Sequence, residues 1–176
     1  MDLDEVGQLE KLAEEAHQDT RESLDLLHNY NGDGNFSPHL QQYLKHLKED
    51  ANINLHLVMP TDELGFDSLV ELELLRICQE ALTNIRKHSG AHNVSVKLKP
   101  VNHHLEVSIA DDGCGFDAIA YYRDGGQAKG HGLTVMKERA DSIGGQFTVL
   151  SLPGQGTEVQ VEVPLTPHRG RLWPKR

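Results

Sequence analysis

The sequence is short of cysteine, and this shortage narrows the kinds of scaffold that it can build. Only two of its 176 residues are cysteines, Cys78 and Cys114, and they lie far apart without forming a CxxC pair. We therefore expect reduced thiols rather than a disulfide framework, with Cys78 packed in the core. The 11 histidines lack the spacing of a structural zinc site, so the pair His103-His104 is expected to be solvated at a turn.

Positive charge and long apolar runs are also scarce. Lysine and arginine total 17 against 27 aspartates and glutamates, which gives a formal net charge of -10. Because nucleic-acid binding relies on clustered Lys and Arg, no nucleic-acid partner is expected, although a local site could still hold a small anion. No apolar run reaches the length of a membrane span, and the first residues lack a signal-peptide pattern. We expect a cytoplasmic chain without membrane contact of its own, whatever anchors a longer parent protein.

What is present is an ordinary globular composition, 38% hydrophobic and 25% charged. Residues 2–28 have an apolar residue every three or four positions, which predicts a helix whose seam requires a partner helix. A second helix is expected to start near Ser37-Pro38, with the serine as its cap. Further helices are predicted over 67–88 and 133–143, the latter ending at Gly144-Gly145, and strands over 53–60, 93–100, 104–110, 146–151 and 157–165.

The predicted strands alternate apolar with polar residues, as in "NVSVKLKP" and "TEVQVEVPL". A sheet built from such strands buries one face and leaves the other in water. The helices must then cover the single apolar face. The sequence therefore predicts an α/β two-layer sandwich with a mixed, mainly antiparallel sheet. Residues 112–131 are rich in glycine and are expected to be irregular, and residues 166–176 are expected to form a loosely ordered tail.

The helix predicted over 67–88 carries two stripes. At about 100° per residue, one apolar face, expected in the core, gathers Leu74, Cys78, Ala81, Leu82 and Ile85. A second stripe lines up Glu80, Asn84, Lys87 and His88. Taken alone, this stripe could be a solvated face with a Glu-to-Asn contact one turn apart.

Three glycine pairs give that stripe another interpretation. They are "DDGCGF" after a strand, "GHGL" before a helix and "GQGT" before the last strand. None matches a Walker A loop or a GxGxxG dinucleotide fingerprint. "GHGL" is nevertheless suited to phosphate, since glycines let a ligand approach the free N–H groups at the positive end of a helix.

Four segments together carry a resemblance to a known family. In their order and spacing, "QEALTNIRKH", "DDGCGF", "GHGLTVMKERA" and "PGQGTEVQVEVP" resemble the ATP-binding domain of bacterial sensor histidine kinases. The forms "QEALTN" and "LTVMKERA" look most like the nitrate/nitrite-sensor subfamily. The wider superfamily also holds gyrase, mismatch-repair and chaperone ATPases. The resemblance covers about residues 50–165, and its cofactors would be ATP or ADP with Mg²⁺.

The resemblance implies roles for individual residues around the phosphates. Asn84 would coordinate Mg²⁺, and Glu80 would act as the general base one helical turn away. Charge or hydrogen bonds for the phosphates would come from Lys87 and His88. Beneath a lid formed by about residues 116–131, the phosphate cradle would comprise Gly130, His131, Gly132 and Leu133.

Other residues would hold the adenine. Asp111 would accept a hydrogen bond from the adenine amine. Gly113 and Gly115 would let the backbone curl under the base, and Thr157 would help to hold it from the other side, directly or through water.

The same resemblance implies a longer parent protein. Residues 1–30 look like the second helix of a dimerisation hairpin, residues 36–165 like the catalytic domain. The acceptor histidine is expected outside this fragment, because His17 is better explained as a solvated helix residue. The partners implied are ATP, the kinase's own phosphoacceptor domain in a homodimer, and a response regulator. Alone, the fragment is expected to be a weak or inactive protein histidine kinase.

Two alternatives stay open at this point. One is an anti-sigma-type serine kinase or nucleotide-gated interaction module of the same fold, which acid-stable phosphate on a partner would support. The other is a scaffold with a degenerate site, which a failure to bind nucleotide would support.

Overall fold

The structure is a computed structural model that describes residues 36–50, 53–60, 67–123 and 131–165. These residues belong to one compact unit, 34–176. The helix predicted over 2–28, including His17, and the tail 166–176 lie outside the described residues, and so does Gly130.

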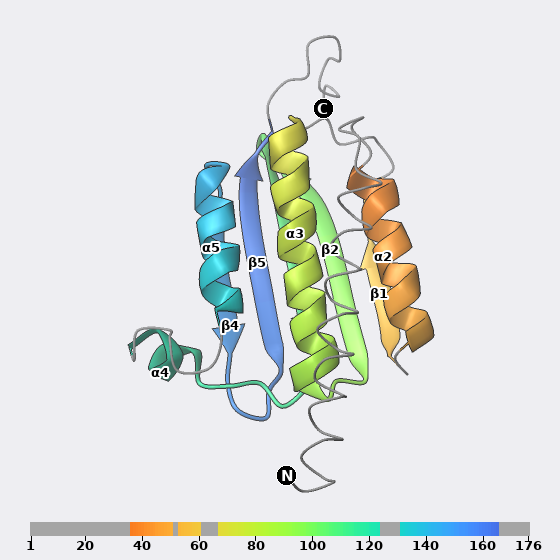
Figure 1. Ribbon diagram of the computed structural model, residues 1–176, viewed down its shortest axis with the longest axis vertical. Helices are drawn as coiled ribbons and strands as arrows, with labels where there is room; N and C mark the ends of the chain where they lie inside the picture. The colour runs from red at the N-terminus through yellow and green to blue at the C-terminus, as the bar shows by residue number, and fades with distance from the viewer. Residues whose placement is uncertain (1–35, 51–52, 61–66, 124–130, 166–176) are drawn as a thin grey trace, which may run out of the picture. The chain divides into compact units, whose positions relative to one another are not determined.

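A five-stranded sheet forms one layer of this unit (Figure 1). Its strands are β1 (Asn54–Val58), β2 (Asn93–Val101), β3 (His104–Asp111), β4 (Gln146–Ser151) and β5 (Thr157–Pro164), in the order β1-β2-β3-β5-β4. β1 pairs with β2 in parallel, and the other three neighbouring pairs are antiparallel. The predicted mixed, mainly antiparallel sheet is confirmed.

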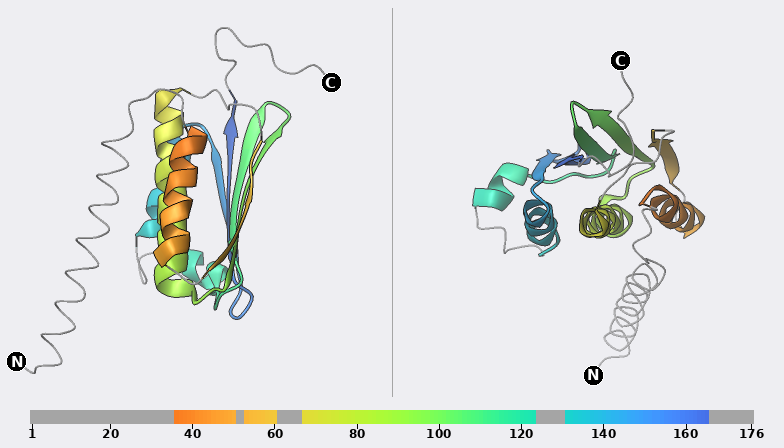
Figure 2. Two further views of the ribbon diagram at one scale, coloured as in Figure 1. Left: turned by 90° about the vertical axis from the view of Figure 1, so that its right-hand side faces the viewer. Right: turned by 90° about the horizontal axis from the view of Figure 1, so that it is seen from above.

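Helices form the second layer. α2 (Phe36–Asp50), α3 (Ser68–Asn84) and α5 (Gly132–Ser142) all cover the same face of the sheet, as both views in Figure 2 show. A short helix, α4 (Ala118–Arg123), lies beside β4 at the edge of the sheet. The α/β two-layer sandwich is therefore confirmed. In the described part of the chain, no helix is both long and apolar enough to cross a bilayer.

The core lies between the two layers because the strands alternate as predicted. The buried strand residues are Val94, Val96 and Leu98 on β2, Leu105, Val107 and Ile109 on β3, and Val159, Val161 and Val163 on β5. The whole predicted apolar face of the helix is also buried: Leu74, Cys78, Ala81 and Leu82 on α3, and Ile85 directly after it. Burial raises the pKa of the Cys78 thiol to about 12, so this cysteine stays protonated and packs as an apolar residue.

Three local features differ from the sequence expectations. The α-helix of α3 stops at Asn84 and continues as a π-helical turn, η1 (Ile85–Ser89), which a wider hydrogen-bond spacing distinguishes. α4 forms inside the stretch expected to be irregular. α2 begins at Phe36, so Ser37 lies inside the helix and is not its cap. The Phe36 N–H donates instead to the buried carboxylate of Glu71 on α3.

The turn between β4 and β5 approaches the end of β3. Gly154 and Gly156 both have positive φ, +77° and +73°, but their surroundings differ. A Cβ at Gly154 would meet nothing within 4 Å, whereas one at Gly156 would stand 1.9 Å from the Asp111 carbonyl oxygen. Position 156 therefore requires glycine for two reasons: the positive φ, and the close approach of the Asp111 carbonyl oxygen.

We predict that alanine at these two glycines has unequal costs. Gly154→Ala should lower the unfolding free energy by roughly 1–2 kcal/mol, because only its left-handed conformation is strained. Gly156→Ala must also displace the backbone of β3 and should cost more than about 3 kcal/mol. Urea unfolding followed by circular dichroism measures both. Equal losses in the two variants would contradict the close approach at Gly156.

Candidate functional site

Glu80 and Asn84 lie at the end of α3, where α5 begins. The Asn84 side-chain amide donates to Glu80 Oε1 over 3.3 Å. A Cβ at Gly132, the first residue of α5, would stand 2.3 Å from the same Glu80 oxygen. The glycine thus lets the start of α5 come into contact with the Glu80 carboxylate. The structure brings these three predicted site residues together.

The N-terminus of α5 is not capped by a side chain. His131 is its N-cap residue, with φ -84° and ψ -8°, and makes no side-chain cap hydrogen bond. His131 is exposed and Leu133 is half-buried. The first N–H groups of a helix have no partner within the helix, and the positive end of its dipole favours anions. This helix end is therefore suited to a phosphate, and it lies against Glu80 and Asn84.

Asp111 ends β3 and is followed by a turn that packs on η1. Asp111 Oδ1 accepts a hydrogen bond of 2.8 Å from the Gly113 N–H. A Cβ at Gly113 would stand 2.3 Å from the Ser89 carbonyl oxygen, and that oxygen accepts a 2.8 Å hydrogen bond from the Cys114 N–H. Gly113 is therefore required by the close packing of two backbone segments, the turn after β3 and the end of η1.

The second glycine of this turn packs against the β4–β5 turn. Gly115 has φ +55°, and a Cβ there would stand 2.2 Å from the Leu152 carbonyl oxygen. Ser151 accepts from the Phe116 N–H at 2.8 Å and lies 2.9 Å from the Thr157 hydroxyl. Thr157 is also the register partner of Asp111. The turn after β3 is thus held from two sides, by η1 and by the β4–β5 hairpin.

The electrostatics of Asp111 follow from its half-buried position at the end of the central strand, β3. Burial raises the pKa of its carboxyl above 3.8, the Gly113 N–H lowers it, the neighbouring Asp112 charge raises it, and the Thr157 N–H lowers it. The carboxylate is thus partly removed from water, where a hydrogen bond to a ligand is stronger than in bulk solvent.

The adjacent aspartate, Asp112, has a structural role. Asp112 Oδ1 accepts from the backbone N–H groups of His92 and Asn93, each at 2.8 Å, and Oδ2 accepts from the Asn93 side chain at 2.6 Å. These hydrogen bonds, led by that of the Asn93 N–H, lower the pKa of Asp112 to about 2. Asp112 therefore fixes the start of β2, and only Asp111 is left for ligand chemistry.

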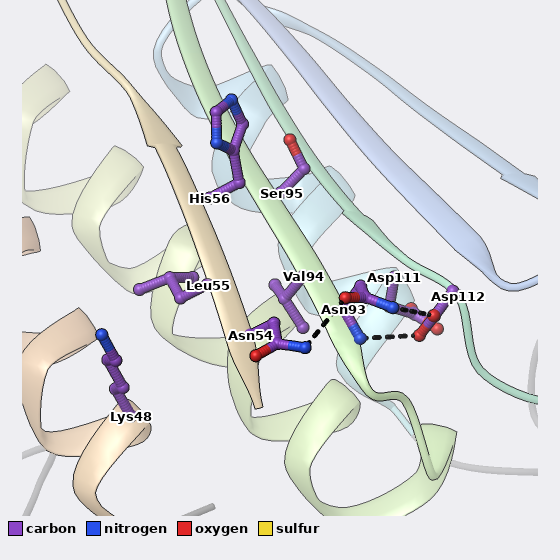
Figure 3. Close-up of a pocket in the computed structure, with 9 residues that line it drawn as sticks. All are labelled: Lys48, Asn54, Leu55, His56, Asn93, Val94, Ser95, Asp111 and Asp112. Atoms are coloured by element: carbon purple, nitrogen blue, oxygen red, sulfur yellow. Dashed lines mark hydrogen bonds between the residues drawn. The ribbon is translucent and has the colours of Figure 1, made fainter. Parts of the chain in front are cut away.

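An open pocket of about 380 Å³ lies at this end of β1, β2 and β3 (Figure 3). It is lined by Lys48, Asn54, Leu55, His56, Asn93, Val94, Ser95, Asp111 and Asp112. Figure 3 shows Asn93 hydrogen-bonded to both Asn54 and Asp112. Asp111 is the one predicted site residue on its wall, so this pocket is not the place where the other predicted residues meet.

Lys87 and His88 lie on η1 and are exposed. Their π-helical turn directly follows Asn84, the last residue of α3, and has a wider hydrogen-bond spacing than an α-helix. The His88 carbonyl accepts from the Cys114 thiol at 3.3 Å. In the described residues, no group of three or more His, Cys, Asp and Glu side chains could hold a metal ion.

Sequence reasoning missed three residues that hold the site together: Ser89, Ser151 and Gly156. Ser89 Oγ donates to the Ile85 carbonyl at 2.7 Å and accepts from the Ala91 N–H at 3.0 Å, which fixes the end of η1. In "HSG" the glycine, Gly90, is a signal for the end of the helix, because a left-handed glycine commonly follows a helix end, but it does not single out the serine. Ser151 acts through contacts between distant segments, which no local pattern reveals.

The geometry agrees with comparisons to known proteins. Residues 69–167 match the family described as histidine kinase-, DNA gyrase B-, and HSP90-like ATPase, and the chain belongs to this family. It is 44% identical over 98 residues to the sensor histidine kinase LiaS of Bacillus subtilis, which covers 56% of this chain and 26% of LiaS. It is 32% identical over 165 residues to the histidine-protein kinase/phosphatase DegS of Brevibacillus brevis, which covers 93% of this chain and 42% of DegS.

A solved structure extends the likeness of the fold. The histidine kinase domain of the Erythrobacter litoralis EL346 blue-light activated histidine kinase superposes with a TM-score of 0.67 at 18% identity, over 82% of this chain and 72% of that one. The family match and the two curated relatives confirm the prediction of an ATP-binding domain of the sensor-histidine-kinase type. The chain spans less than half the length of the two curated relatives named above.

We predict that the stabilisation by Asp112 depends on pH. A carboxyl whose folded-state pKa is lowered stabilises the fold above its ordinary pKa, 3.8, and loses this effect as the pH falls towards about 2. Asp112→Asn should therefore be less stable than the wild type at neutral pH, and the gap should close over that acid range. Denaturant titrations across the range measure it, with the exposed Asp141→Asn as control. A gap that did not change with pH would contradict the charged role of Asp112.

Proposed function

We propose that residues 36–165 bind Mg-ATP and transfer its γ-phosphoryl group to a histidine that lies elsewhere in the intact kinase. One observation carries this proposal. Two segments far apart in the sequence contact the last part of α3 and the η1 turn that continues it, towards the lower end of α3 in Figure 1. The start of α5 lies against Glu80 and Asn84, and the turn after β3 packs on Ser89. These segments carry the Asp111 carboxylate, the Asn84 amide and the uncapped N-terminus of α5. Such groups suit the base, the metal ion and the phosphates of a nucleotide.

The adenine end is assigned to the turn after β3. The Asp111 carboxylate would accept a hydrogen bond from the exocyclic amine, and its partial burial makes that bond specific. Gly113 and Gly115 let the turn that follows Asp111 pack closely on Ser89 and Leu152. Thr157, opposite Asp111 in the sheet, would hold the other side of the base.

The phosphate end is assigned to α3 and α5. Phosphate oxygens would accept from the N–H groups near Gly132 and Leu133, while Lys87 and His88 would add donors from η1. Gly130 and His131 are assigned to the same end, beneath a lid of about residues 116–131.

The donor set fits Mg²⁺. The Asn84 amide nitrogen donates to Glu80, which directs its oxygen away from that carboxylate for use as a ligand. Mg²⁺ prefers oxygen and typically takes one or two protein ligands, with phosphates and water for the rest. A site without a cluster of three carboxylates or histidines among the described residues is consistent with that mode of binding. When bound, the ion would supply charge neutralisation for the phosphates.

Glu80 is assigned the role of general base. Its carboxylate lies beside both Asn84 and the start of α5, next to the proposed phosphate end. There it could accept the proton of the attacking imidazole. Phosphoryl transfer has a loose transition state, so the main contribution of the chain is to position the phosphates and compensate their charge.

Further assignments concern the intact protein. "QEALTN" and "LTVMKERA" support a kinase of the nitrate/nitrite-sensor type. Residues 1–30 would supply one helix of a dimerisation hairpin in a homodimer, and a response regulator would receive the phosphoryl group. The catalytic domain would work in the cytoplasm.

We predict that Mg-ADP binding depends on the charge of Asp111. Calorimetric titration of the wild type should show binding, and Asp111→Asn should weaken it by about tenfold or more, since a hydrogen bond to a charged group is lost. Because burial raises the pKa of Asp111, the wild-type affinity should fall on acidification at a higher pH than an ordinary aspartate would give. The Asn variant should lack this dependence.

Two further variants make this experiment specific. Asp141→Asn removes an exposed carboxylate from α5, whose partner is Lys137 at 2.7 Å, and should leave the affinity unchanged. In Mg²⁺ buffer, Asn84→Ala should bind ADP only as tightly as the wild type binds it when EDTA has removed the Mg²⁺. Equal affinities for wild type and Asp111→Asn would overturn the adenine assignment, and no binding by the wild type would overturn the proposed function.

A further inference from the structure

α3 and α5 are joined at a second place, away from the proposed phosphate end. Arg139 on α5 lies 2.6 Å from Glu73 Oε2 on α3. Arg76, one turn further along α3, lies 3.6 Å from the other oxygen, Glu73 Oε1. The Glu73 side chain is only 12% exposed and that of Arg139 is 29% exposed. A partly buried carboxylate with an arginine at each oxygen is a strongly directional contact between the helices.

The two contacts between these helices share one register. Glu73 precedes Glu80 by seven positions, and Arg139 follows Gly132 by seven positions. Seven residues make about two turns, or roughly 10 Å, of any α-helix. The Glu73–Arg139 pair and the Glu80–Gly132 contact can therefore form together only if α3 and α5 run antiparallel and neither helix slides along the other. The ion pair therefore marks the axial position of α5 along α3.

Other contacts fix that position less well. Met136 and Ala140 of α5 are fully buried, but apolar packing is non-directional and tolerates sliding better than an ion pair does. Gly132 has no side chain with which to hold α5 in place. The charged pair Lys137–Asp141 lies within α5, more than half exposed, and does not reach α3.

We propose that Glu73 and Arg139 are positioning residues for the nucleotide's phosphates. Their ion pair holds α5 at the axial position that places its N-terminal N–H groups beside Glu80 and Asn84, two turns away. This inference rests on the proposed function, since it assigns the phosphates to that helix end. Neither residue touches the nucleotide, so their effect is expected on the phosphate end and not on the adenine end.

The test separates the two ends by comparing AMP with ADP. Both nucleotides are titrated in the same Mg²⁺ buffer into the full chain as wild type, Glu73→Gln, Arg139→Gln, the double variant and Asp141→Asn. The extra affinity of ADP over AMP should fall about fivefold in each single Gln variant, and no further in the double variant, because the pair acts as a unit. The AMP affinity should stay within about twofold, and Asp141→Asn should match the wild type.

The outcomes are distinguishable. An equal loss for AMP and ADP, or an undiminished advantage of ADP, overturns the positioning role, as do additive losses in the double variant. If circular dichroism shows that a Gln variant does not fold, Arg139→Lys, which keeps the charge but not the planar fork, carries the same comparison and should show a smaller loss. No binding of ADP by the wild type overturns the proposed function instead.

Discussion

The hydrogen bond from the Cys114 N–H to the Ser89 carbonyl is the contact on which the site depends. It joins the end of η1, which continues the helix of Glu80 and Asn84, to the turn that follows Asp111, at a distance of 2.8 Å. The bond can form only because Gly113 has no side chain, since a Cβ there would overlap the same Ser89 oxygen. This junction adds to the pairing of Asp111 with Val94 on β2, the strand that follows η1, in holding the end of β3 beside the end of the helix.

The same kind of constraint recurs around the site. Gly115 admits the Leu152 carbonyl, Gly156 admits the Asp111 carbonyl, and Gly132 admits the Glu80 carboxylate. Each glycine marks a place where backbone or a carboxylate approaches more closely than a side chain would allow. The glycine pairs of the sequence therefore serve the assembly of the site directly, and a nucleotide would use the space that this assembly leaves.

Much of the fold could be predicted, because the spacing of apolar residues in the sequence indicates which face of each strand or helix is buried. The alternation of Val94, Val96 and Leu98 gave the inner face of β2, and the spacing of Leu74, Cys78 and Leu82 gave the buried face of α3. What escaped prediction depends on contacts between distant residues. The start of α2 is set by Glu71, 35 positions away from Phe36, and not by a local serine cap.

The site residues likewise fall into those that could be predicted from the sequence and those that could not. The resemblance to sensor histidine kinases indicated Glu80, Asn84, Asp111 and Gly132 as site residues, and the structure places the two on α3 against the start of α5. The pattern "DD" could not show which aspartate is structural, because Asp112 is fixed by N–H groups 19 and 20 positions away. Nor could helical periodicity foresee the π-helical turn that carries Lys87 and His88.

Hydrogen–deuterium exchange of the full chain with and without Mg-ADP would locate the nucleotide on the fold. We predict slower exchange in the turn after β3, at the end of η1 and in the first turn of α5, with β1 unchanged. Protection confined to β1 and the start of β2, the strands that line the open pocket with His56 and Ser95, would contradict this prediction and place the ligand elsewhere.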